Sequence, residues 1–309
     1  MNQLCGTMIG EFAALGAALS WVVSAVLYKQ ALAEVKPISA NIFRLASTSI
    51  LLVLFVTVIG KLTILSTLPF EAVVLACASG VVGLGLGDTC YMISLKLIGV
   101  SRAVPLTCIY PLFNILWAIS LKGEPFNPTI AFGAVIIVSG IWLVSKQEKE
   151  SLQNIEKKTL VRGVVFALAT ALFWSVSISM IDLAVTLPAT STLDHALAIN
   201  TIRIVAIATI LIVFSPIVDR KMEFLRMKRR VAGKLLVGGA VALGLGWFFL
   251  AFSLLSTSEA LAVPISSTTP FFSTLSGVVF LHESVNKKTV VGSIMVVAGI
   301  FVLFMMNSA

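Results

Sequence analysis

The amino-acid sequence predicts an all-α polytopic membrane protein, with ten transmembrane helices arranged as two inverted repeats of five helices. Its mean hydropathy is +1.05 and only 12% of its residues are charged, whereas soluble domains carry about 25% charged residues. Ten apolar stretches are long enough to cross a bilayer. Most motifs of the first half also recur 159 residues later in the second half.

Each apolar stretch has the roughly 17–25 residues that a spanning helix needs. None shows the alternation typical of a strand, and a helix satisfies its own backbone polar groups in lipid, so we expect helices throughout. The predicted spans are residues 11–28, 38–59, 72–92, 103–121, 129–145, 163–184, 198–218, 235–254, 261–281 and 289–307.

The duplication sets the domain organisation. Five spans are an odd number, so the second unit must enter the membrane upside down relative to the first, as in many secondary transporters. We expect a first repeat at 1–145, a polar linker at 146–162 and a second repeat at 163–309. The recurring positions include Trp21 with Trp174, Asn41 with Asn200, Arg44 with Arg203, 84–87 with 243–246, Pro105 with Pro264, and Pro111 with Pro270.

The basic residues are distributed unevenly between the two sets of loops. Of the 22 Lys and Arg residues, 18 lie in loops on one side, and only Lys61 and Lys122 lie on the other. Cytoplasmic loops carry the excess of Lys and Arg, so we expect both termini outside and the protein in the plasma membrane. The loop 219–234 holds seven of the 18, which suits contact with anionic lipid headgroups.

Two spans are interrupted by prolines and carry polar side chains. Pro105 and Pro111 lie in the fourth span, and Pro264 and Pro270 in the ninth. A proline inside a helix removes a hydrogen bond and kinks it. We favour a broken, polar helix lining a pathway in each half over hydroxyl groups that only bond back to their own carbonyls. The polar residues beside these kinks are Tyr110, Asn114, Ser266 and Thr268.

Asn41-x-x-Arg44 and Asn200-x-x-Arg203 each place an amide and a guanidinium one turn apart, near the start of a span. One interpretation is structural: the arginines snorkel to the surface or pair with a helix end. The other is that a guanidinium recognises an anionic group such as a carboxylate.

Asp88 is the one acid well inside a span, and its counterpart in the second half is Trp247. An intramembrane acid is a candidate proton or cation site. Lys96 and Arg102 are nearby in sequence and would neutralise it. Trp21 and Trp174 lie in mid-span, where they either line a cavity or pack between helices.

The sequence contains no pattern typical of an enzyme. No HExxH motif or Ser-His-Asp arrangement is present, and no residue set suggests a metal or another cofactor. The net charge of +8 follows from the basic loops, and no nucleic-acid-binding framework accompanies it. We therefore expect neither catalysis nor nucleic-acid binding.

The order of these motifs resembles the EamA-type permeases of the drug/metabolite transporter superfamily. The resemblance rests on residues 18–24, 41–44, 105–124 and 133–140 with their second-half partners, and it covers almost the whole chain. It implies alternating-access movement of a small metabolite, often export of an amino acid or related solute. It also implies a central cavity, here carrying Trp21, Asp88, Tyr91, Tyr110, Trp174 and Thr268.

The charge pattern departs from this family in one respect. Its members commonly have both termini in the cytoplasm, whereas the count of 18 against 2 places them outside, and we keep the charge-based orientation. The alternatives are a flippase for a lipid-linked sugar or amine, with Arg44 and Arg203 at a phosphate, and a membrane receptor or scaffold. The sequence leaves open whether the chain forms a homodimer.

Overall fold

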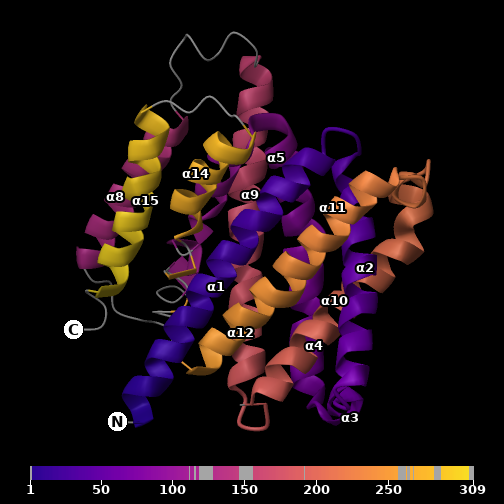
Figure 1. The fold of residues 1–309 in the computed structure, drawn as a ribbon. Coiled ribbons are helices and arrows are strands. Elements are labelled where there is room, and N and C mark those ends of the chain that lie inside the picture. The colour runs from indigo at the N-terminus through magenta and orange to yellow at the C-terminus, as the bar shows by residue number, and fades with distance from the viewer. Residues whose placement is uncertain are drawn as a thin grey trace.

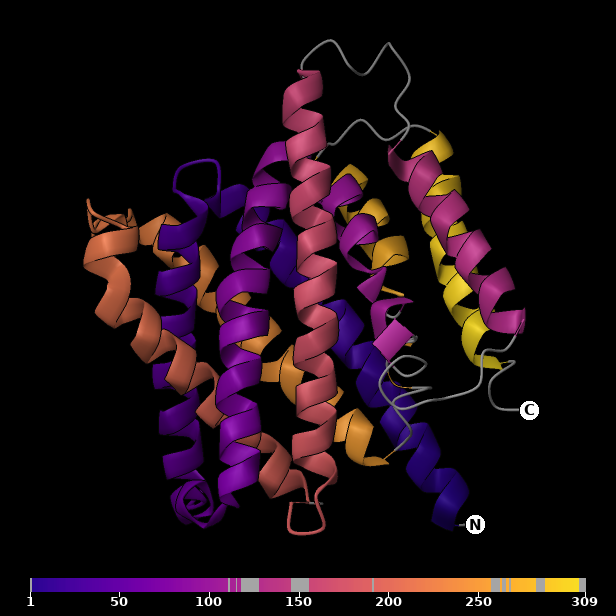
Figure 2. The ribbon, with the colours of Figure 1, turned by 180° about the vertical axis from the view of Figure 1, so that it is seen from behind.

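The apolar stretches of the sequence form long helices in the computed structural model of the protein (Figures 1 and 2). Within the part of the chain that is described, every regular element is a helix. The structure describes residues 2–110, 112–114, 116–117, 128–145, 156–190, 192–256, 262, 265–266, 268–281 and 287–305.

The first half of the chain has helical segments in each of its five predicted spans. A short helix, α3 (Leu62–Thr67), lies outside them between the second and third spans. The segments within the spans are α1 (Asn2–Ala31), α2 (Pro37–Val58), α4 (Phe70–Ser79), η1 (Gly80–Gly87), α5 (Asp88–Ile98), α6 (Val100–Thr107) and α8 (Pro128–Ser145).

The second half follows the same order. Its first helix begins at Lys157, so the last residues of the predicted linker 146–162 are helical, and 146–155 lie outside the described residues. The elements are α9 (Lys157–Thr186), α10 (Leu193–Val218), η2 (Glu223–Leu225), α11 (Arg229–Gly239), η3 (Ala240–Gly246), α12 (Trp247–Ser256), α14 (Thr269–Leu281) and α15 (Lys287–Met305).

Within the described residues, six helical segments are long and apolar enough to cross a membrane. Their outward faces carry exposed apolar side chains such as Phe55 and Val213, which suits contact with lipid. The predicted number of ten spans stays a prediction. The six segments are Ile9–Ala31, Pro37–Val58, Phe70–Ile98, Lys157–Thr186, Leu193–Val218 and Arg229–Ser256.

The predicted fourth and ninth spans differ from continuous helices. α6 contains Pro105 and ends at Thr107, and a turn follows at residues 108–109. α14 begins at Thr269, so Pro270 is its second residue, where a missing N–H is well tolerated. Pro111 and Pro264, the other two predicted kinks, lie outside the described residues.

The third span and its counterpart, the eighth, each contain a π-helical segment. η1 runs over the Leu-Gly-Leu-Gly stretch of the first half, and η3 ends on the same stretch in the second. In a π-helix the backbone bonds reach one residue further than in an α-helix, and such segments are frequent at functional sites. The recurrence of 84–87 at 243–246 in the sequence did not predict this widening.

The two halves are interleaved instead of lying side by side. α1 packs against α11, η3 and α12, and α9 makes the equivalent contacts with α4, η1 and α5. α2 packs against α10, and α6 against α14. α8 and α15 form a pair at one side of the bundle (Figures 1 and 2). The centre of the molecule is therefore built from both repeats.

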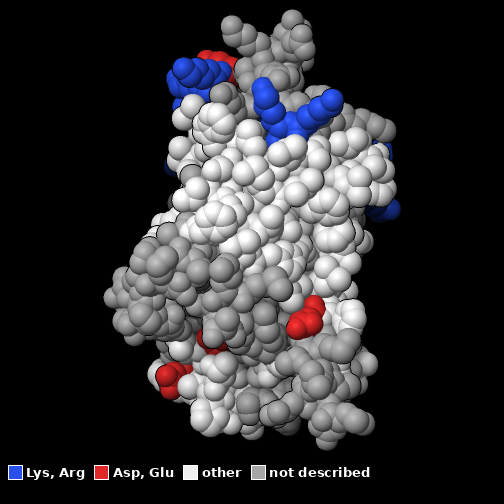
Figure 3. All heavy atoms as spheres, turned by 90° about the vertical axis from the view of Figure 1, so that its left-hand side faces the viewer, with Lys and Arg blue, Asp and Glu red and all other residues white. Residues whose placement is uncertain are grey.

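The ends of the bundle differ in charge. On the side seen in Figure 3, the blue Lys and Arg side chains gather at the upper end, above a broad band that is mostly uncharged. The N-terminus lies at the opposite end in Figure 1. Ion pairs join the halves at both ends: Lys36–Glu223 at 2.5 Å and Lys228–Glu34 at 2.7 Å in one set of loops, and Lys61–Asp194 at 2.6 Å in the other.

Candidate functional site

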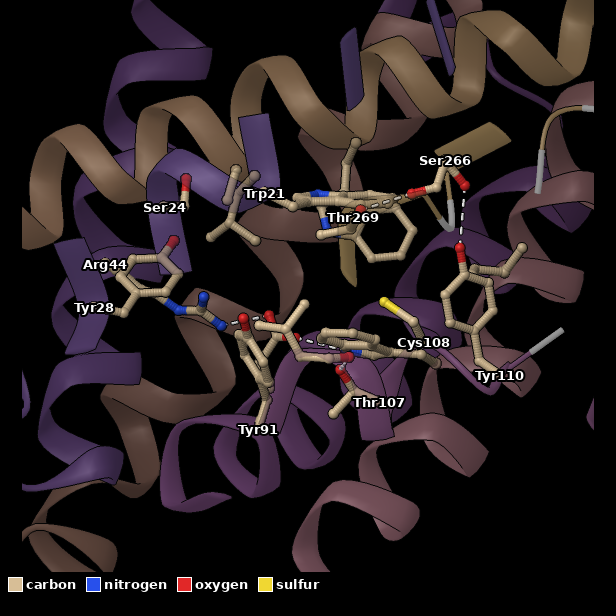
Figure 4. A pocket seen from close by; sticks show the side chains of 17 residues that line it. Trp21, Ser24, Tyr28, Arg44, Tyr91, Thr107, Cys108, Tyr110, Ser266 and Thr269 are labelled. Atoms are coloured by element: carbon tan, nitrogen blue, oxygen red, sulfur yellow. Dashed lines mark hydrogen bonds and ion pairs between the residues drawn. The ribbon is translucent and has the colours of Figure 1, made fainter. Parts of the chain in front are cut away.

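A cavity lies at the centre of the bundle, between the two repeats (Figure 4). Its volume is about 40 Å³, which is room for a few water molecules. Its walls are Trp21, Ser24, Tyr28, Arg44, Asp88, Tyr91, Val104, Thr107, Cys108, Tyr110, Trp174, Ile178, Ala242, Leu243, Trp247, Ser266 and Thr269.

An ion pair between Arg44 and Asp88 forms part of the cavity wall. Arg44 is 1% exposed and Asp88 3%, so both charges are removed from water and depend on each other. The Arg44 Nε also donates to the Asn41 Oδ1 at 2.9 Å, and its guanidinium lies 4.9 Å from the centre of the Tyr28 ring. The i, i+3 spacing of the Asn-x-x-Arg motif thus orients the cation.

The structure corrects two sequence-based interpretations of these charges. Asp88 is paired with Arg44, not with the nearby Lys96, whose Nζ donates to the Val35 carbonyl at 3.1 Å. Neither arginine snorkels, because Arg203 is also fully buried. Both motifs lie about two turns inside their helices, where the neighbouring π-helical spans cover them.

The asparagine of each motif ties its helix to the π-helical segment of the same repeat. The Asn41 Nδ2 donates to the Leu84 carbonyl at 3.0 Å and to the Thr89 Oγ1 at 2.8 Å. The Asn200 Nδ2 donates to the Leu243 carbonyl at 2.9 Å. A buried carbonyl must be satisfied inside a membrane, so Asn41 fixes the backbone from which Asp88 projects, and Asn200 fixes the backbone that leads to Trp247.

Arg203 occupies a different environment from Arg44, although the two positions are equivalent. Its Nη2 donates to the Ser177 Oγ at 2.9 Å, and its guanidinium lies 4.0 Å from the centre of the Trp247 ring. Among the described residues, its Nε and Nη1 have no hydrogen-bond partner, nor does the Asn200 Oδ1. The site residue Asn200 therefore does not hold Arg203 as Asn41 holds Arg44.

Each mid-span tryptophan lines the cavity and reaches across to the other repeat. The Trp174 Nε1 donates to the Asp88 Oδ1 at 2.7 Å, and its ring centre is 5.0 Å from that of Tyr91. Trp21 meets Trp247 edge-on at 5.4 Å between ring centres. Of the two roles considered for these residues, the structure supports cavity lining.

A second polar group lies at the other end of the cavity in Figure 4, away from Arg44 and Tyr28. The Tyr110 hydroxyl and the Ser266 Oγ are 3.1 Å apart and join the fourth and ninth spans. Two predicted residues do not line the cavity. The Asn114 Oδ1 accepts from the Ser175 Oγ at 2.5 Å, and the Thr268 Oγ1 donates to the Ile265 carbonyl at 2.8 Å.

Several cavity residues were not selected from the sequence. Ser24 lies three residues after Trp21, and Tyr28 lies four residues after Ser24, which places all three on one face of α1. That spacing could have identified Ser24 and Tyr28 as cavity residues from the sequence. Thr107, Cys108 and Thr269 lie at the helix breaks, next to residues that were selected. Trp247 carried no polar signal, because its role depends on its contacts with the second-half arginine and with Trp21.

The described part of the chain offers little for metal chemistry. No group of three or more His, Cys, Asp or Glu side chains there could hold a metal ion. The cavity instead combines aromatic walls, hydroxyl groups and one ion pair. Such a lining binds an organic molecule through ring contacts and a few hydrogen bonds.

Interleaved apolar helices around a cavity that both halves line define a multi-pass membrane protein. The sequence profile of the EamA-like transporter family matches residues 8–146 and 161–305, and the chain belongs to this family. It is thus a membrane transporter by family, and the resemblance seen in the sequence is confirmed.

Two further comparisons agree with this assignment. A curated protein of Archaeoglobus fulgidus named "Uncharacterized transporter" is 23% identical over 303 residues, covering 96% of this chain and 99% of that protein. A solved crystal structure of a protein 19% identical in sequence shares the fold, with a TM-score of 0.67 over 98% of both chains.

Proposed function

We propose that this chain is a secondary active transporter that moves a small metabolite, an amino acid or a related solute, by alternating access. The observation that carries the proposal is the central cavity, which side chains of both repeats line. A site at the interface of two inverted repeats can be exposed to either side when one repeat moves against the other. Membership of the family supports transport as the class of function, and the cavity is the proposed binding site for the solute.

The polar groups of the cavity suit a small solute with ionised groups. Arg44 presents a guanidinium to the cavity, the natural partner of a carboxylate. The aromatic walls suit an apolar body. Asp88, Tyr91, Tyr110, Trp21, Trp174 and Ser266 are the substrate-binding candidates from the sequence that line the cavity.

The orientation and direction are part of the same proposal. The excess of basic residues at one end supports a cytoplasmic location for that end. The N-terminus lies at the other end in Figure 1, which supports termini outside the plasma membrane. Export is the direction that the family resemblance favours.

A flippase for a lipid-linked sugar or amine has weaker support. That alternative used both arginines as ligands of a phosphate headgroup, but Arg203 is fully buried and is not among the cavity-lining residues. A receptor or scaffold without transport would need no solute in the cavity. The experiment in the next paragraph distinguishes the transporter, the flippase and the receptor or scaffold.

The proposal is tested by measuring binding and transport with purified protein. Thermal melting in detergent is recorded against amino acids, related carboxylates, amines, sugars and lipid headgroups, and hits are assayed by counterflow in proteoliposomes. A bound solute raises the melting temperature with concentration. The variant Trp21→Ala removes a cavity wall, and Thr209→Val, at an exposed position on α10, is the matched control.

We expect a small solute to stabilise and to exchange across the membrane in the wild type and in Thr209→Val, and not in Trp21→Ala. A response to lipid headgroups alone would replace the proposal with the flippase. A protein that is stabilised by a solute but never exchanges it would support a receptor. No response to any compound would contradict solute binding altogether.

A further inference from the structure

The buried charges of the described spans do not sum to zero. Three ionised side chains there are almost fully buried: Arg44, Arg203 and Asp88, with exposures of 1%, 0% and 3%. Arg44 and Asp88 form an ion pair. Arg203 has no carboxylate partner among the described residues, so this part of the core carries a net charge of about +1.

The second repeat replaces the acid by an aromatic ring. Asp88 and Trp247 are equivalent positions, 159 residues apart. Asp88 bonds to Arg44, whereas the Trp247 ring lies against Arg203 at 4.0 Å. A ring face attracts a cation but does not neutralise it, and within the described part of the chain the Arg203 side chain donates its hydrogen bond to the neutral Ser177 hydroxyl.

An unpaired charge buried away from water is costly, and in such a place it acts over a longer distance than in solvent. Arg203 lies directly behind Trp247, which is part of the cavity wall, and Arg44 lines the same cavity. The buried charges described beside the cavity therefore sum to about +1. An anion that enters it compensates the charge that the protein leaves unmatched.

We propose that the transported solute is a small organic anion, a carboxylate with an apolar body and no compensating ammonium group. Its carboxylate lies in the cavity near Arg44 and Trp247, and its apolar part contacts Trp21, Tyr91 and Trp174. This inference rests on the proposed function, because it assumes that the cavity holds the solute. It narrows the proposed metabolites to those with a net negative charge.

The test compares three probes of nearly the same shape: phenylacetate, its neutral amide phenylacetamide, and the amine phenethylamine. Their dissociation constants are measured by thermal melting on purified protein. Two variants change the core charge in opposite directions. Asp88→Asn raises it by one unit, and Trp247→Asp gives Arg203 an acid at the position equivalent to Asp88.

We expect phenylacetate to bind at least about tenfold more tightly than the amide, and phenethylamine to bind most weakly. Asp88→Asn should raise the ratio of phenylacetate affinity to amide affinity several-fold, and Trp247→Asp should lower this ratio by about tenfold. General damage to the cavity would weaken binding in both variants. If Trp247→Asp does not fold, Arg203→Gln produces the same net charge.

Equal binding of the acid and the amide would overturn the inference, as would shifts in the same direction for both charge variants. Tighter binding of the amine, or of a zwitterion such as phenylalanine, would also overturn it, yet would leave solute transport through this cavity standing. If the wider panel of metabolites fails as well, the proposed function fails with it.

Discussion

Asp88 and Trp247 occupy equivalent positions in the two repeats, and each lies between the arginine of its own repeat and the tryptophan of the other. Asp88 contacts Arg44 and Trp174, and Trp247 contacts Arg203 and Trp21. The two positions are equivalent in the repeats, but one side chain is a carboxylate and the other is an indole. One side of the cavity therefore presents an ion pair, and the other presents an indole ring over a buried cation.

The first prediction concerns the ion pair in the cavity wall. Arg44→Gln leaves the Asp88 carboxylate buried without its cation, and breaking a buried pair in this way costs about 3–5 kcal/mol. Asp88→Asn alone should cost less, because the amide oxygen can still accept from Trp174 and Arg44. Adding Asp88→Asn to Arg44→Gln should recover most of the loss.

These effects are measured as melting temperatures of the single and double variants in the same detergent. The non-additive part gives the coupling of the two residues. Simple addition of the two single losses would show that Arg44 and Asp88 act independently, contrary to the structure.

The second prediction uses the symmetry of the two tryptophans. Trp174→Phe keeps the ring but removes the Nε1 donor to Asp88, and a hydrogen bond to a charged group contributes about 1.5–3 kcal/mol. Trp21→Phe is the matched control, because Trp21 meets Trp247 through ring contact and its indole makes no hydrogen bond within the described part of the chain. Trp174→Phe should lower the melting temperature more than Trp21→Phe does. Equal losses would mean that the Trp174 hydrogen bond contributes nothing to stability.

The repeat register could be predicted from the sequence, and so could much of the cavity. Motif recurrence located Arg44, Trp21 and Trp174, and Asp88 was identified as the one acid well inside a span, where the second half has Trp247. Polar and aromatic residues are conspicuous inside apolar spans. The register also indicates which contacts recur at equivalent positions of the two repeats. The same contacts recur in both repeats: Ser24 donates to the Gly238 carbonyl and Ser177 to the Ser79 carbonyl, at equivalent positions.

The partners of these residues could not be predicted, because they depend on how the halves interleave. Asp88 is close in sequence to Lys96, yet α5 lies against α2 and brings Arg44 to it. The π-helical segments were also missed, since glycine-rich stretches are compatible with several helix geometries. The difference between Arg44 and Arg203 follows from a single substitution, Asp against Trp, whose effect is visible only in space.

A third prediction concerns the approach of the third span to α9. A Cβ added to Gly83 would lie 2.2 Å from the Ser177 Oγ and 3.1 Å from the Arg203 Nη2. Gly83→Ala should thus push Ser177 off its contacts and cost about 1–3 kcal/mol. Gly233→Ala is the control, because nothing lies within 4 Å of its added Cβ in α11. If both variants melt alike, the close approach at Gly83 is not a constraint.

The last prediction is a pH dependence at the basic end of the bundle. Glu34 accepts a hydrogen bond from Lys228 and lies in its field, which lowers the pKa of the Glu34 carboxyl below its ordinary 4.5. A lowered pKa means that the pair stabilises the fold fully above pH 4.5 and loses this effect as the pH falls through the folded-state value. Wild type should melt above Glu34→Gln at pH 7, and the difference should vanish on acidification and in about 1 M salt, where charges are screened within ~3 Å. A difference that persists at low pH would show that Glu34 contributes through packing and not through its charge.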